Sequence, residues 1–179
     1  MKVIETQFGR LDVLVNNAGI LLDGKEPEQE EKKMSSGVRE LFERTFATNV
    51  VGTACLTDAL VPLLRKAGGV PRVVFVSSRM GSLAQAKIKD TMYYAIDYKA
   101  YDASKAAVNM LALNYARILE DVGGKVNVVC PGLVKTGLSG WHEYGTTTEV
   151  GARRVVELAC LGRDGPTASF SDREGEIAW

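Results

Sequence analysis

Three short apolar runs, separated by two long amphipathic segments, constrain the fold of this 179-residue chain more than any other feature. The runs span residues 11–16, 72–78 and 125–130, and small or polar residues follow each of them. Near-continuous apolar runs of this length are typical of strands buried on both faces of a parallel sheet. The segments 41–64 and 101–119 carry apolar residues every three or four positions, which predicts helices.

The alternation of strand and helix predicts an α/β fold with a parallel sheet covered by helices. Residues 79–99 show no clean period and predict a loop with one helical turn. A third helix is expected over 149–161 and a short edge strand over 176–179. The charged segment 23–36 predicts a solvated loop or a helix start. No linker or repeat divides the chain, so a single domain over residues 1–179 is expected.

The charge balance excludes some classes of partner. Lys and Arg number 22 and Asp and Glu number 22, so the net charge is zero. A nucleic-acid binder or a polybasic membrane anchor needs a basic excess, so neither is expected. The N-terminus lacks a secretory signal, and the apolar runs are too short to span a bilayer. The cysteines are scattered without metal-ligand spacing, which favours reduced thiols, no metal and a cytoplasmic location.

Tyr101 and Lys105 form the first candidate pair for chemistry. They are four residues apart on a predicted helix and therefore share a face. A nearby ammonium favours phenolate, so Lys105 is expected to lower the pKa of Tyr101. Such a tyrosine can exchange a proton with an alcohol or carbonyl oxygen, and Ser78 could bind the same oxygen. The spacing alone is weak, because a tyrosine and a lysine on a helix surface give the same pattern.

Further motifs, in order along the chain, resemble those of the short-chain dehydrogenase/reductase family. They are Asn16-Asn-Ala-Gly19 after a strand, Asn49 in the next helix, Ser78 in Val-Ser-Ser, Tyr101-Asp-Ala-Ser-Lys105, and Cys130-Pro-Gly-Leu-Val-Lys-Thr136. The resemblance covers nearly the whole chain and implies a Rossmann-like sheet with helices on both faces. Within the family, residues 131–179 resemble carbonyl-reductase-like members.

The resemblance also implies roles for individual residues. Tyr101 would be the general acid in ketone reduction, Lys105 would bind the nicotinamide ribose, Ser78 would orient the substrate oxygen, and Asn49 would hold a water on the proton path. The implied cofactor is NADP or NAD, with NADP favoured. Besides Tyr101 and Lys105, its expected contacts are Asn17, Ala18, Gly19, Pro131, Gly132, Val134 and Thr136. Candidate substrate contacts are Tyr94, Tyr98, Trp141 and His142; for His142 the alternative is a loop histidine without a role.

Two departures from the family pattern bear on function. Ser78 and Tyr101 are 23 residues apart, which is longer than the family usually has. The added residues include three tyrosines, which either shape a substrate pocket or anchor a surface loop. The second departure is that no Gly-x-x-x-Gly-x-Gly turn occurs near residue 1, so the fold is expected to be N-terminally truncated. Weakened dinucleotide binding is therefore expected, because that turn normally holds the pyrophosphate.

The truncation also leads to an expectation about assembly. The strand 11–16 would lie at an open sheet edge, which favours pairing with another chain. We therefore expect a homo-oligomer formed through this strand or through the long helices. The sequence is compatible with three functions. The first is nicotinamide-dependent oxidoreduction of a small molecule. The second is non-redox chemistry without nucleotide, such as isomerisation, dehydration or cyclisation, and the third is a non-catalytic truncated product.

Overall fold

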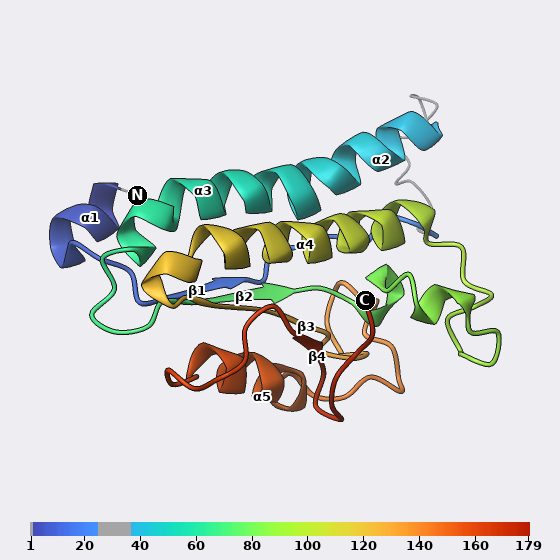
Figure 1. The fold of residues 1–179 in the computed structure, drawn as a ribbon. Coiled ribbons are helices and arrows are strands. Elements are labelled where there is room, and N and C mark those ends of the chain that lie inside the picture. Colours follow the sequence, from blue (N-terminus) through green and yellow to red (C-terminus); the bar gives the residue numbers. More distant parts are fainter. Residues whose placement is uncertain (1, 25–36) are drawn as a thin grey trace.

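The core of the fold is a parallel sheet of four strands. The structure is a computed structural model that describes residues 2–24 and 37–179. The strands are β1 (Val13–Asn16), β2 (Arg72–Val76), β3 (Lys125–Val129) and β4 (Phe170–Ser171), in the order β1-β2-β3-β4 (Figure 1). All three pairings are parallel. The predicted α/β class is confirmed.

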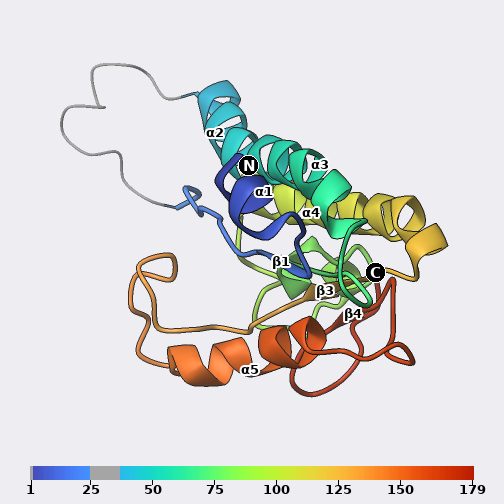
Figure 2. The same cartoon turned by 90° about the vertical axis from the view of Figure 1, so that its left-hand side faces the viewer.

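Helices cover both faces of the sheet, as predicted. One face carries a continuous rod made of α2 (Val38–Phe46), a π-helical turn (Ala47–Gly52) and α3 (Thr53–Leu64), with α4 (Lys99–Ile118) beside it. The opposite face carries α5 (Thr148–Ala159) (Figures 1 and 2).

The alternation of side chains along β2 explains this three-layer arrangement. Val73 and Phe75 are buried in the larger core, together with residues of α3 and α4. Val74 belongs to a second, smaller core with Leu158 of α5. Because successive strand residues point to opposite faces, one valine-rich strand buries apolar surface on both sides. The near-continuous apolar runs in the sequence follow from this double burial.

Several elements differ from the expectations. A short helix, α1 (Lys2–Phe8), precedes β1 and had not been expected. The loop 79–99 contains two 3₁₀ turns, Arg79–Gly81 and Gln85–Lys87, and another 3₁₀ turn, Glu120–Val122, follows α4. The 3₁₀ and π turns lack the sustained periodicity that makes a helix visible in a sequence.

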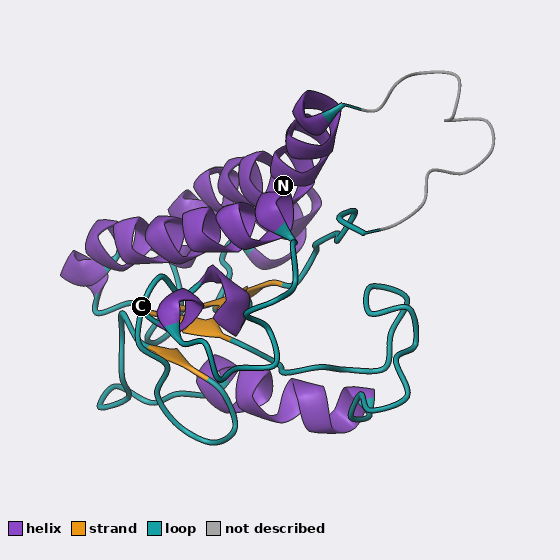
Figure 3. Ribbon diagram, turned by 90° about the vertical axis from the view of Figure 1, so that its right-hand side faces the viewer, coloured by secondary structure: helices purple, strands orange, loops and turns teal. Residues whose placement is uncertain are grey.

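The predicted edge strand at 176–179 is wrong. The fourth strand is Phe170–Ser171, and Glu176 makes only an isolated antiparallel bridge to Ser171. The last residues instead turn back beside the loop that follows β2, where the Ala84 N–H donates to the Trp179 carbonyl at 2.9 Å. Figure 3 shows the C-terminus next to the 3₁₀ turns of the loop that follows β2. The apolar tail pattern therefore reflects packing, because the Trp179 ring lies 5.5 Å from that of Phe170.

The rod Val38–Leu64 is long and apolar enough to cross a membrane by length and composition alone. The core helix of a globular protein meets the same criterion. Here α3 buries Leu60, Leu63 and Leu64 in the larger core, while 28% of the most apolar window of the rod is buried.

Candidate active site

The candidate site lies at the carboxyl ends of the parallel strands. In-register pairing of β1 with β2 and of β2 with β3 brings the segments that follow Asn16, Val76 and Val129 to one edge of the sheet. Ligands of open α/β sheets bind in this position. The helix α4 crosses this edge and contributes Tyr101, Ser104 and Lys105, all of them buried.

Lys105 is a buried ammonium that is held by the sheet. Lys105 is only 4% exposed, and its Nζ donates to the Val76 carbonyl at 3.0 Å. The Ser77 hydroxyl donates in turn to the Lys105 carbonyl at 3.2 Å. Burial lowers the pKa of Lys105 to about 8, because the interior disfavours the charged form. The end of β2 therefore fixes both the helix and the amine.

Tyr101 does not show the lowered pKa that the sequence suggested. Burial raises the pKa of its phenol above the ordinary value, and a hydrogen bond with Ser78 opposes the shift only in part. The Lys105 ammonium lies over the Tyr101 ring, 5.5 Å from its centroid. Desolvation is the largest cause of the raised pKa, and the charge of Lys105 is not among the causes. Tyr101 keeps its proton at neutral pH, as the donor in a reduction must.

Asn49 is placed by the π-helical turn and ties three elements together. It is 1% exposed, and its Oδ1 accepts from the Ile20 N–H at 2.8 Å. Its Nδ2 donates to the Ile20 carbonyl at 2.9 Å and to the Ser104 hydroxyl at 3.0 Å. The π-helical turn was not predicted from the sequence. The asparagine thus fixes the loop after β1 against α4.

Gly19 lies where this loop meets the lysine. A Cβ at this position would be 3.3 Å from the Lys105 Nζ and 3.5 Å from the Asn49 Oδ1. The structure therefore brings together one cofactor candidate and two catalytic candidates. Ala18 and Asn17 precede Gly19 on the same loop, with the Asn17 N–H donating to the Val15 carbonyl at 3.1 Å.

The segment that follows β3 also lies at the carboxyl edge of the sheet. Gly132 takes a φ of +77°, a conformation that suits glycine and lets the chain turn after Pro131. The Ser139 hydroxyl donates to the Val134 carbonyl at 2.6 Å and accepts from the Thr136 N–H at 3.2 Å. These bonds fix the loop whose cofactor-contact role the sequence predicted.

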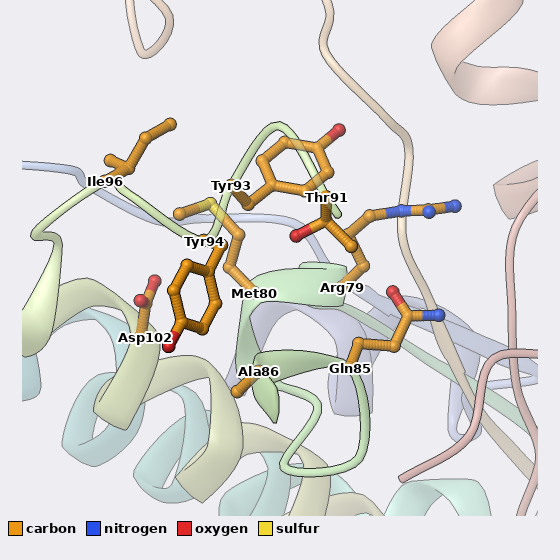
Figure 4. Close-up of a pocket in the computed structure, with 9 residues that line it drawn as sticks. All are labelled: Arg79, Met80, Gln85, Ala86, Thr91, Tyr93, Tyr94, Ile96 and Asp102. Atoms are coloured by element: carbon orange, nitrogen blue, oxygen red, sulfur yellow. The ribbon is translucent and has the colours of Figure 1, made fainter. Parts of the chain in front are cut away.

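The four substrate candidates do not gather at one place. Tyr94 lines a cavity between α4 and the loop that follows β2 (Figure 4). Tyr98 lies at the N-terminal end of α4, next to Gly24, and does not line this cavity. Trp141 is 70% exposed, and His142 is exposed with its ring 5.7 Å from that of Tyr144. The structure thus connects only Tyr94 with a pocket.

Asp23 is a positioning residue that sequence reasoning missed. It was expected in a solvated charged segment, yet it is only 5% exposed. Its two carboxylate oxygens accept from the N–H groups of Ala100 at 2.9 Å and Tyr101 at 3.0 Å. It therefore caps α4 from a distant part of the chain and fixes the backbone of Tyr101. The other charged residues of that segment, at 25–33, lie outside the described residues.

We expect Asp23→Ala to lower the free energy of unfolding by about 2 kcal/mol, because two buried N–H groups lose their acceptors. Asp23→Asn retains one acceptor oxygen, so its loss should be about half as large. Urea unfolding followed by circular dichroism measures both. The exposed Asp164→Ala is the control and should change stability by less than about 0.5 kcal/mol. An equal loss for Asp23→Ala and Asp164→Ala would contradict the capping role.

Arg79 and Asp172 form a second feature that no sequence pattern indicated. The Arg79 guanidinium donates to the Asp172 carboxylate, which is mostly buried. This pair joins the turn after β2 to the segment after β4. The residues are 93 positions apart, so their contact depends on the sheet order and not on a local motif.

Comparisons with known proteins agree with this geometry. A family model for short chain dehydrogenases matches residues 1–143. The short-chain dehydrogenase/reductase ATR10 of Stachybotrys chlorohalonatus is 34% identical and covers 97% of this chain and 63% of its own length. Salutaridine reductase of Papaver somniferum is 32% identical, over 94% of this chain and 71% of the reductase. The structure of NADPH-bound carbonyl reductase from chicken fatty liver superposes with a TM-score of 0.78 at 25% identity, over 99% of this chain and 70% of that one.

The chain therefore belongs to the short-chain dehydrogenase/reductase family. The chain spans 63% and 51% of the lengths of two curated relatives that it matches. Its sheet, its helices on both faces and its resemblance to carbonyl reductases are those the sequence predicted.

The residues present fit the nicotinamide end of a dinucleotide. The Lys105 ammonium has three N–H donors, and one of them is used by Val76. The absence of a side chain at Gly19 leaves the ammonium approachable from the loop after β1. Lys105 can thus donate to hydroxyl groups of a bound nucleotide.

Proposed function

We propose that this chain is an NADPH-dependent oxidoreductase that interconverts a carbonyl and an alcohol on a small organic molecule. One observation carries the proposal: the buried Tyr101 lies beside the buried ammonium of Lys105, with Ser78 close enough to act on the pKa of the Tyr101 phenol. A proton donor, a second hydroxyl and a cation at one sheet edge are the groups that carbonyl reduction requires.

Each side chain has a defined task in this proposal. The bound nicotinamide supplies the hydride, and the protein supplies position and proton transfer. Ser78 donates to the substrate carbonyl oxygen and orients it toward Tyr101. Tyr101 gives its phenolic proton to that oxygen as negative charge develops on it. Lys105 stabilises the phenolate that remains, through a charge held by the Val76 carbonyl.

NADPH is proposed over NADH because two similar solved structures, both 25% identical to this chain, are described as NADPH complexes. One is the chicken carbonyl reductase, and the other is a short chain dehydrogenase from Escherichia coli CFT073. The proposed ligand contacts on this chain are those at Gly19, Lys105 and the segment 131–136.

The test is a titration of the purified 179-residue chain with NADPH, followed by nucleotide fluorescence. We expect saturable binding by the wild-type chain and an affinity about tenfold to a hundredfold lower for Lys105→Met, because ribose hydroxyl groups lose charged donors. The exposed Lys66→Met is the matched control and should bind like the wild type. Absence of saturable binding would overturn the proposed cofactor. Nucleotide-free turnover that Tyr101→Phe abolishes would then establish non-redox chemistry at the same site.

A homo-oligomer in the cytoplasm is proposed as the working state. Among the described residues β2 is the only strand that pairs with β1, so the other edge of β1 is available for pairing. The long helices also expose apolar side chains, including Leu56 and Met110. The three cysteines are free thiols, which suits a reducing compartment. Analytical ultracentrifugation at micromolar concentration should give a dimer or larger species, and a single monomeric species would contradict the assembly.

A further inference from the structure

A cavity of about 90 Å³ lies between the first turn of α4 and the loop that follows β2. The three residues that define its chemistry are Tyr93, Tyr94 and Asp102 (Figure 4). Met80 and Thr91 complete this part of the wall. A space of this size holds a group of a few heavy atoms, roughly three waters in volume.

The cavity adjoins the proposed reaction centre through the chain itself. Asp102 follows Tyr101, and Met80 is two residues after Ser78. The Met80 N–H donates to the Ser78 hydroxyl at 3.2 Å, which fixes this wall to the catalytic serine. Residues that line the cavity therefore lie one position from Tyr101 and one or two positions from Ser78 along the chain.

The charge in the cavity is not balanced by the side chains around it. Within the described part of the chain, the buried Asp102 Oδ1 has no hydrogen-bond partner. Arg79 also lines the cavity, but its guanidinium is engaged by Asp172. Lys99 is engaged by the exposed Asp97 at 2.6 Å. The negative charge of Asp102 thus has no cation assigned to it among the described residues.

The electrostatics of this region favour a cation from outside. Burial, together with the negative charges of Asp23 and Asp97, raises the pKa of Asp102 to about 7. A positive group in the cavity would stabilise the carboxylate, and tyrosine rings attract a cation through their faces. A neutral apolar group would leave the carboxylate without a partner, which is costly in a partly buried position.

We propose that this cavity binds a protonated amine, and that the amine belongs to the carbonyl substrate. Asp102 supplies the counter-charge, and Tyr93 and Tyr94 supply the aromatic wall. Asp102 is then a specificity-determining residue that selects amine-bearing carbonyl compounds over neutral ones. The assignment of the amine to the substrate rests on the proposed function, whereas amine binding itself does not.

Amine binding is tested with isobutylammonium and its neutral counterpart isobutanol, titrated into the ¹⁵N-labelled chain at about pH 8. At that pH a carboxyl with a pKa of about 7 is ionised and an alkylamine is protonated. We expect the amide signals of Thr91, Tyr94 and Asp102 to shift, with isobutylammonium binding about tenfold more tightly than isobutanol. Equal affinity for the two probes would overturn the proposal.

Three variants test the side chains. Asp102→Asn should remove the preference for isobutylammonium, and Tyr94→Leu should reduce it about threefold while keeping an apolar wall. Asp164→Asn removes the same charge from an exposed position that does not line the cavity, so it should keep the preference. A preference that survives Asp102→Asn, in a variant whose amide spectrum shows a folded chain, would also overturn the proposal.

Kinetics separates this inference from the proposed function. With NADPH, an amine-bearing ketone should show a KM about tenfold lower than its neutral analogue, and Asp102→Asn should remove the difference with little change in kcat. Reduction of both ketones with equal KM would overturn the inference and leave the proposed function intact. Ammonium binding without any reduction would contradict the proposed function and retain the cavity as an amine site.

Discussion

Tyr101→Phe is expected to lower kcat for carbonyl reduction by about 10²- to 10⁴-fold, the range that positioned general acids contribute. The variant removes one oxygen, and the ring can stay in place because Tyr101 is buried in the first turns of α4. Burial keeps the phenol protonated at neutral pH, so the wild-type chain carries the proton that phenylalanine lacks. Steady-state oxidation of NADPH, followed by its absorbance, measures the loss.

The size of the loss distinguishes proton transfer from binding. NADPH affinity should fall by no more than about tenfold in Tyr101→Phe, because one hydroxyl contact is lost while Lys105 and the loops at Gly19 and 131–136 remain. Tyr98→Phe is the matched control, since it removes a phenol oxygen three residues away from the proposed catalytic group, and it should retain wild-type kcat. Equal turnover by the wild type and Tyr101→Phe would remove the catalytic role assigned to this residue.

The sequence was sufficient for the elements that depend on local patterns. Buried strands and long amphipathic helices leave a period that can be read directly, and β1, β2, β3 and α4 begin within two residues of the expected positions. The family motifs then placed the catalytic set on those elements. The structure brings Asn49, Lys105 and Gly19 together as their order along the chain implied.

The remaining features depend on contacts between distant segments. Asp23 looked like one member of a charged segment, because nothing local shows that its carboxylate caps a helix 77 residues later. The raised pKa of Tyr101 has a similar origin. The spacing of Tyr101 and Lys105 predicted a lowered pKa, whereas the desolvation that raises the pKa depends on the packing of α4 against the sheet. The last strand was misplaced because a two-residue strand has no period.

Gly81→Ala is expected to destabilise the fold by about 3 kcal/mol, at the upper end of the cost of overpacking a closely packed contact. A Cβ at this position would lie 2.6 Å from the carbonyl carbon of Lys105 and 2.7 Å from the amide nitrogen of Ala106. Both atoms belong to the backbone of α4, which cannot rotate away as a flexible side chain would. The Gly81 carbonyl also accepts from the Asn109 Nδ2 at 3.2 Å, so displacement strains a second contact.

The same displacement should reduce turnover, because the segment pushed aside carries Lys105 while the Arg79–Gly81 turn is joined to Ser78. Gly69→Ala provides the control: no atom lies within 4 Å of its added Cβ, and its φ is outside the left-handed region. Thermal unfolding of the two variants separates the close approach from a general effect of adding a methyl group. A loss of stability in Gly81→Ala no larger than that in Gly69→Ala would show that α4 and the turn after β2 do not hold each other in place. Geometry at Lys105 would then have to be maintained by the Val76 carbonyl and the Ser77 hydroxyl alone.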